Sequence, residues 1–167
     1  MRQVMEESGM RIPYQDDSCY MIEKSALVAR LQGVKIVEFV QANGKAKVVM
    51  VEAKTSAPQP TNKGDYDEYL KEIREKFQNS ISLLNAARLK RQEGIFEELP
   101  QPLKDVDYKK ANYWLYFVIK ESKEDWVVNL KDDLRKQLHP FLKSWNIPDV
   151  NFIVANEDTA RRLGVVE

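Results

Sequence analysis

Two neighbouring apolar segments, separated by an Asn-Gly turn, constrain the fold of this chain most strongly. Residues 34–41 (VKIVEFVQ) and 46–55 (AKVVMVEAKT) are rich in β-branched and aromatic residues, which favour strands. The intervening residues 42–45 (ANGK) are typical of a tight turn. The two segments therefore predict an antiparallel β-hairpin in the core of the protein.

The remaining patterns predict strands and helices on both sides of this hairpin. The expected strands are residues 18–24, 112–121 and 149–155, and the expected helices are residues 25–31, 65–90, 124–138 and 157–163. A kinked continuation of the third helix past Pro140 to residue 145 is left open. Meander strands come first and helix-linked strands follow. This order predicts an α/β (α+β) fold with a mixed central β-sheet, an antiparallel meander and flanking helices.

The length and the 43% hydrophobic content indicate a single globular domain over residues 1–167. Two segments lack a clear pattern. Residues 1–17 are polar and are expected to be a loose N-terminal arm or a short helix. Residues 92–110 are polar and contain prolines, so we expect a connector there.

Charge and cysteine content narrow the classes of function. Lys and Arg total 26, as do Asp and Glu, so binding to nucleic acid would need a local basic patch. The single cysteine, Cys19, cannot form an intrachain disulfide and fits a reducing compartment. Residues 1–11 have no signal-like apolar run, and no stretch approaches the ~18 apolar residues of a membrane span. We therefore expect a cytoplasmic protein without membrane contact.

Three charged residues interrupt the apolar strands of the hairpin. Because side chains alternate along a strand, Glu52 and Lys54 share one face of segment 46–55. Glu38 similarly interrupts the preceding strand. Charges in a central strand are costly unless they are paired or bind something.

The length of the hairpin loop decides which way Glu38 points. A two-residue loop would place Glu38 opposite Val49, away from Glu52. A three-residue loop would place it opposite Val48 or Met50, on the same face as Glu52. The sequence Ala-Asn-Gly suits the longer loop, with glycine in a left-handed bulge position. We therefore predict the longer loop and the convergence of the three charged groups.

The residue types of this cluster indicate its chemistry. Two carboxylates are hard oxygen ligands suited to Mg²⁺ or Mn²⁺, so Glu38 and Glu52 are candidate metal ligands. Such a cation would polarise a phosphodiester and lower the pKa of a bound water. Lys54 would orient the attacking water or offset charge developing on the phosphate. Glu23, near the end of the first predicted strand, is a further candidate ligand.

This pattern resembles that of the PD-(D/E)XK nuclease superfamily, in which an acidic residue in one strand is followed by (D/E)-x-K in the next. Glu38 stands in the first acidic position, without the usual preceding proline, and Glu52-Ala53-Lys54 stands in the second. The resemblance implies a restriction-endonuclease-like fold and a Mg²⁺-dependent nuclease acting on DNA, ahead of RNA. It also implies a polar residue on the helix after the motif strand, with Lys76 the candidate ahead of Gln78 and Ser80.

Other classes of function are also compatible with the sequence. In one, the three charged groups form a structural ion pair, and the chain is a catalytically inactive nuclease-like module for binding or assembly. In another, the chain is a subunit of a larger defence or restriction complex and is active only with a partner protein or as a homodimer. The aromatic strand 112–121 and the connector 92–110 could support such association.

Overall fold

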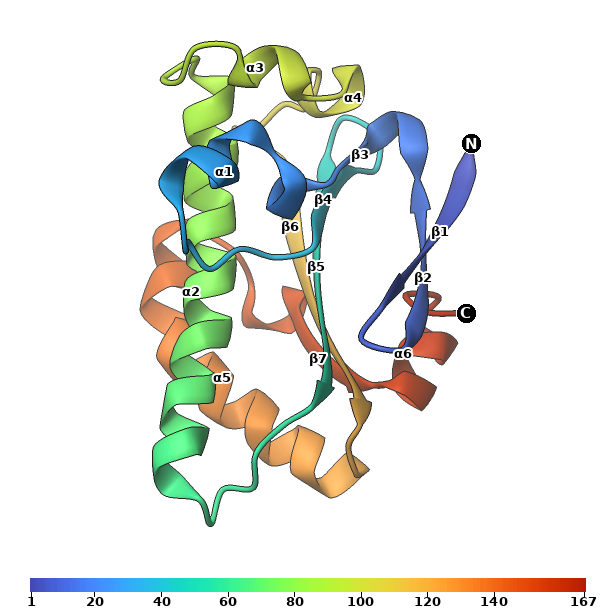
Figure 1. Ribbon diagram of the computed structural model, residues 1–167, viewed down its shortest axis with the longest axis vertical. Helices are drawn as coiled ribbons and strands as arrows, with labels where there is room; N and C mark the ends of the chain where they lie inside the picture. The colour runs from blue at the N-terminus through green and yellow to red at the C-terminus, as the bar shows by residue number, and fades with distance from the viewer.

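The computed structural model describes residues 1–167 and has a five-stranded mixed β-sheet at its centre (Figure 1). The strands, in spatial order, are β3 (Cys19–Tyr20), β4 (Phe39–Ala42), β5 (Lys47–Ser56), β6 (Asn112–Glu121) and β7 (Phe152–Asn156). The β3–β4 and β4–β5 pairs are antiparallel, whereas β5–β6 and β6–β7 are parallel. The predicted α/β fold, with its meander and flanking helices, is confirmed.

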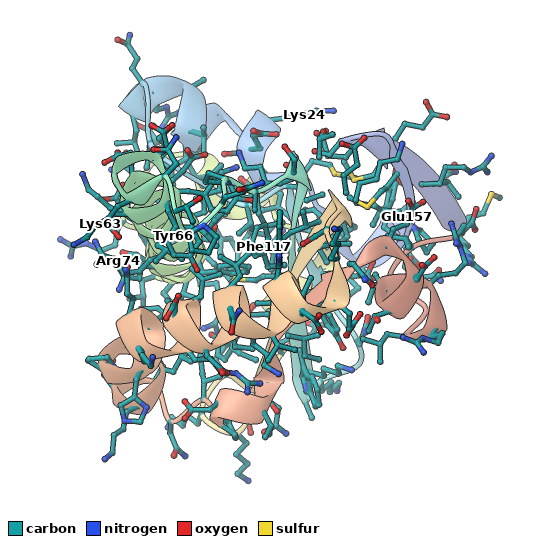
Figure 2. All side chains as sticks on the ribbon, turned by 90° about the horizontal axis from the view of Figure 1, so that it is seen from below. Lys24, Lys63, Tyr66, Arg74, Phe117 and Glu157 are labelled. Atoms are coloured by element: carbon teal, nitrogen blue, oxygen red, sulfur yellow. The ribbon has the colours of Figure 1, made fainter.

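Two long helices, α2 (Lys63–Arg88) and α5 (Glu124–Ser144), connect the parallel strands and cover the same face of the sheet (Figure 1). Two successive right-handed crossovers that advance in one direction place both helices on one face. Their buried residues recur every three or four positions and pack against the sheet in the larger of two apolar cores. Figure 2 shows Phe117 of β6 pointing into this core. None of the helices is both long and apolar enough to cross a lipid bilayer.

The N-terminal segment is a β-hairpin, so the expectation of a loose arm or short helix at residues 1–17 is wrong. The two strands of the hairpin and the helix beside it are β1 (Arg2–Glu7), β2 (Met10–Gln15) and α6 (Glu157–Arg162). They cover the opposite face of the sheet (Figures 1 and 2). Met10 and Ile12 are buried in the smaller apolar core there. Only these two buried residues alternate among polar neighbours, so the strand pattern in the sequence is weak.

The expected connector at residues 92–110 contains two short helices, α3 (Ile95–Glu98) and α4 (Gln101–Lys104). Its buried apolar residues, which join the larger core, are Ile95, Leu99, Leu103 and Val106. The three- or four-residue spacing is helical, but two prolines between these positions obscure it in the sequence. The segment is therefore part of the packed domain.

Some element boundaries near the hairpin differ from expectation. Helix α1 (Ala26–Leu31) is capped by Ser25, whose side chain accepts a hydrogen bond from the N–H of Val28. The strand expected at residues 18–24 is reduced to β3, which is followed by a 3₁₀ turn. The strand expected from residue 34 begins only at Phe39, because the backbone N–H of Val37 donates to a side chain of α2 instead of to another strand.

Candidate active site

Glu38 lies directly before β4, and its carboxylate lies near that of Glu52 in β5. Phe39 is paired with Val51, and the N–H of Glu38 donates a 3.1 Å hydrogen bond to the carbonyl of the same Val51. The negative charge of Glu52 acts on Glu38 from the neighbouring strand. Both side chains are buried, with 6% of Glu38 and none of Glu52 exposed. The face of the sheet is therefore the predicted one.

The hairpin loop has three residues, as predicted, but it lies one position further along the chain. Asn43 donates a 2.8 Å backbone hydrogen bond to Lys47, which leaves Gly44–Ala46 as the loop, with Gly44 at φ +70°. The register of β4 against β5 is therefore shifted by two residues from the one that pairs Glu38 with Met50, and by four from the one that pairs it with Val48. The expectation that Glu38 faces Val48 or Met50 is wrong, because the apolar pattern fixes the face and leaves the position of the turn open.

Glu52 is the deepest charged residue of the cluster. Lys76 Nζ of α2 lies 2.7 Å from Glu52 Oε1, and Lys54 Nζ lies 3.9 Å from the same oxygen. Neither carboxylate oxygen receives a well-directed hydrogen bond, and Oε2 has no partner in the protein. Burial raises the pKa of Glu52 to about 7, although the charge of Lys76 opposes this shift. An incompletely satisfied, buried carboxylate is a costly feature in a protein core.

Glu38 lies among other carboxylates. Burial raises its pKa to about 8, and the negative charges of Glu52 and Glu23 contribute to this shift. Glu23 is itself exposed, in the 3₁₀ turn after β3. The structure thus brings Glu23, Glu38 and Glu52 into one neighbourhood.

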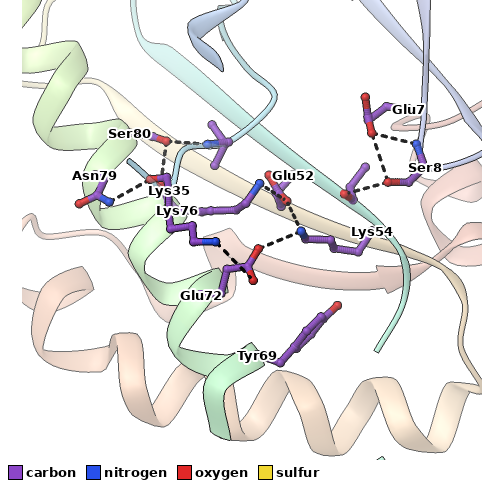
Figure 3. Close-up of polar contacts among 12 residues, drawn as sticks. Glu7, Ser8, Lys35, Glu52, Lys54, Tyr69, Glu72, Lys76, Asn79 and Ser80 are labelled. Carbon is purple, nitrogen blue, oxygen red and sulfur yellow. Dashed lines mark hydrogen bonds and ion pairs between the residues drawn. The ribbon is translucent and has the colours of Figure 1, made fainter. Parts of the chain in front are cut away.

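Lys54 is partly exposed, and its strongest contact is with a residue that the sequence did not indicate. Its Nζ donates a 3.0 Å hydrogen bond to Glu72 Oε1 of α2 (Figure 3). Partial burial would lower the pKa of Lys54, but this hydrogen bond and the charges of Glu52 and Glu72 raise it. The same hydrogen bond lowers the pKa of Glu72 against the opposing effect of burial.

One face of α2 positions the site. Glu72, Lys76 and Ser80 are spaced by four residues and project toward the sheet side of the helix (Figure 3). Ser80 Oγ accepts a 3.0 Å hydrogen bond from the backbone of Val37, and Asn79 donates a 2.9 Å hydrogen bond to the carbonyl of Lys35. These two bonds hold the loop before β4 against the helix. Lys76 and Ser80 thus lie where the sequence placed them, on the helix after the motif strand.

The turn of the N-terminal hairpin contacts the backbone of β5 next to the site. Ser8 Oγ donates a 3.1 Å hydrogen bond to the carbonyl of Ala53, between Glu52 and Lys54 in the sequence (Figure 3). The charge of the adjacent Glu7 contributes to the raised pKa of Glu38. This contact was not foreseen, because no strand was expected in the first 17 residues.

A cleft of about 300 Å³ lies beside the cluster, between α2 and the loop that precedes β4; Lys76 lines it, whereas Glu38, Glu52 and Lys54 do not. Its charged lining residues are Glu23, Lys35, Glu72 and Lys76. A second hollow of about 200 Å³ lies on the opposite face of the sheet and includes Ile12, Phe39 and Tyr116. None of the clustered charged residues lines that second hollow, so the cleft beside α2 is the candidate active site.

The residues of the cluster fit a divalent cation on chemical grounds, with two carboxylates rather than three. Glu52 has a buried oxygen without a partner, and the charge of Glu52 raises the pKa of Glu38, so a cation between them would relieve both penalties. No group of three His, Cys, Asp or Glu side chains is arranged to hold a metal ion. The remaining ligands would have to be main-chain or water oxygens.

Comparison with known proteins adds no relative. No protein-family model, curated protein or solved structure matches this chain.

Proposed function

We propose that this chain is a Mg²⁺-dependent phosphodiesterase, related to the PD-(D/E)XK nucleases, that hydrolyses nucleic acid, with DNA preferred over RNA. The observation that supports this most directly is Glu52, which is fully buried, lies close enough to Glu38 to raise its pKa and retains an oxygen without a partner. Buried carboxylates with raised pKa values in a cleft are typical of functional sites.

The order of elements supports the same proposal. An antiparallel pair, β4 and β5, is followed by α2 and by β6, which lies parallel to β5. The acidic residue beside the first of these strands and the Glu-x-Lys at the end of the second then meet on the face that α2 covers. This is the arrangement that the resemblance implies for a restriction-endonuclease-like core.

Each charged residue has a role in the proposed reaction. Glu38 and Glu52 would hold Mg²⁺ or Mn²⁺, which when bound would polarise the scissile phosphate. Lys54 would orient the attacking water or offset charge that develops on the phosphate. Lys76 would keep Glu52 ionised and directed into the site, since it is the nearest cation to that carboxylate.

The test is cleavage of plasmid and single-stranded DNA in the presence of Mg²⁺ or Mn²⁺. Lys54→Ala should cut at least about 100-fold more slowly than the parent, because a preorganised charge at the reacting group is lost. Lys71→Ala is the matched control, since Lys71 is an exposed lysine of α2 paired only with Glu68. Equal rates for Lys54→Ala and the parent would contradict the mechanism.

A non-catalytic binding or assembly module is the second candidate, and one observation favours it. Lys76 already lies 2.7 Å from Glu52, and Lys54 is bonded to Glu72, so the charges are partly paired within the protein. Calorimetric titration with Mn²⁺ separates the two candidates. Binding that Glu38→Gln abolishes supports the nuclease, whereas no binding to the parent supports the module. The cytoplasmic location stays a prediction.

A further inference from the structure

Glu72 lies between two lysines at the candidate active site. Its Oε1 accepts the 3.0 Å hydrogen bond from Lys54, and its Oε2 lies 3.9 Å from Lys35 Nζ (Figure 3). The lysines come from two different elements, β5 and the loop before β4, and neither contacts an anion other than glutamate. One carboxylate thus neutralises positive charge that the fold gathers from distant parts of the sequence.

We propose that Lys35 and Lys54 form a binding site for a phosphate group, and that Glu72 takes the place of this group while no substrate is bound. The proposal deepens the proposed function and rests on it in one respect, because the phosphate would belong to the backbone of a nucleic acid. Lysine ammonium groups bind phosphate as point charges, and two of them around one anion suit its spread of negative charge.

The exposure of these groups separates them from the deeper pair. The side chains of Lys35, Lys54 and Glu72 are 50%, 29% and 26% exposed, so an anion in solvent can reach all three, and Lys35 and Glu72 also line the cleft. The side chains of Glu52 and Lys76 are only 0% and 9% exposed, so an anion from solvent cannot replace Glu52 beside Lys76. Partly exposed ion pairs are weak, so an incoming phosphate can displace the carboxylate.

Helix α2 fixes the backbone of the loop that contains Lys35. Asn79 of α2 donates to the carbonyl of Lys35, and Ser80 accepts from the N–H of Val37. Glu72 is on the same helix, so the loop that contains Lys35 and the carboxylate that meets it are positioned by one element. The cleft of about 300 Å³ beside them provides space for a phosphate group.

The experiment is titration of the protein with inorganic phosphate, without any divalent cation, followed by NMR and calorimetry. Glu72→Gln keeps the shape of the side chain and removes its charge. It should bind phosphate about fivefold more tightly than the parent, because the competing ion pair is lost. Lys35→Ala should weaken phosphate binding, and the double variant Glu72→Gln/Lys35→Ala should lose the gain. Glu68→Gln removes an exposed carboxylate of the same helix and should have no effect.

Unchanged or weaker phosphate binding by Glu72→Gln would overturn the proposal, and so would normal binding by Lys35→Ala. A second arm uses a phosphorothioate oligonucleotide, again without a divalent cation. Tighter binding of both ligands by Glu72→Gln supports a site for the nucleic-acid backbone, and tighter binding of phosphate alone overturns that assignment. Neither binding experiment measures cleavage, so the phosphate site and the nuclease function are tested separately. If phosphate binds as expected but the parent does not cut DNA in the cleavage assay, the nuclease function is refuted and the phosphate site stands.

Discussion

Consecutive residues of β5 lie in two different environments on the two faces of the sheet. Val51 and Ala53 point toward the N-terminal hairpin and are buried in a core whose members are all apolar. Glu52, between them, points toward α2 and is equally buried, yet it meets Lys76 and Glu38. The same strand thus contributes apolar packing on one face and a buried charge cluster on the other.

This difference indicates which residues serve stability and which serve another purpose. Burying an ion pair costs solvation, and apolar residues of similar size often stabilise a fold as well or better. A strand selected for stability alone would therefore have an apolar residue at position 52, as it has at position 51. The contrast can be tested by changing the two faces separately.

The largest expected effect is the separation of activity from stability at positions 51 and 52. Glu52→Gln should lower the rate of DNA cleavage about 1,000-fold, because a group at the reacting centre is lost. Its urea midpoint should change little, because the buried charge of Glu52 is removed while Lys76 loses its nearest partner, and these two effects oppose each other. Val51→Ala should lower the free energy of unfolding by about 1–2 kcal/mol and leave the rate unchanged under native conditions. If both variants changed the same property, the two faces would not differ in the way described.

The next effect concerns the ion pair that keeps Glu52 charged. Lys76→Met should destabilise the protein by about 3 kcal/mol at pH 8, because the buried carboxylate of Glu52 loses its nearest cation. At pH 5.5 the loss should be smaller, because Glu52 is then protonated. Urea unfolding at the two pH values measures both.

The double variant Glu52→Gln/Lys76→Met is the control for this prediction, and it should recover most of the stability lost by Lys76→Met alone. An equal loss at both pH values would show that the aliphatic part of Lys76, rather than its charge, provides the stabilisation.

The sequence predicts much of the fold but only part of the site. The long apolar run of β6 and the helical spacing of α5 predict their elements well, because each is nearly continuous. The hairpin register differs from the two expected ones by two and four residues, since a glycine fits several positions of a turn. Glu72 could not be identified from the sequence, where it is one of many charges on a helix. Its significance comes from Lys35 and Lys54, which only the folded chain brings beside it.

The pH dependence of stability is a smaller effect that sharpens the contrast. Folding raises the pKa of Glu52 to about 7 and that of Glu38 to about 8, mainly by burial, from an ordinary value of 4.5. Between pH 4.5 and about pH 8 the native state holds more protons than the unfolded chain, so the free energy of unfolding falls as the pH rises. We expect the thermal midpoint to be about 3 °C lower at pH 8 than at pH 5.5.

Two variants and Mg²⁺ identify the source of that pH dependence. Glu38→Gln should reduce the fall, whereas Val51→Ala should lower the midpoint equally at both pH values. Excess Mg²⁺ at pH 8 should raise the midpoint of the parent but not of Glu38→Gln, because binding to the native state is stabilising. A parent midpoint that rises from pH 5.5 to pH 8 would contradict the assigned pKa shifts.

The smallest expected effect is at the contact between the hairpin turn and the site. Ser8→Ala removes the 3.1 Å hydrogen bond to the carbonyl of Ala53 and should lower the free energy of unfolding by about 1 kcal/mol. Ser8 has φ +51°, and alanine is no better suited to this conformation than serine, so the backbone strain is matched. Amide exchange should accelerate in β1 and β2 more than in β6, because the bond joins the hairpin to the sheet. Uniform acceleration throughout the chain would show that the hairpin unfolds only together with the charged face.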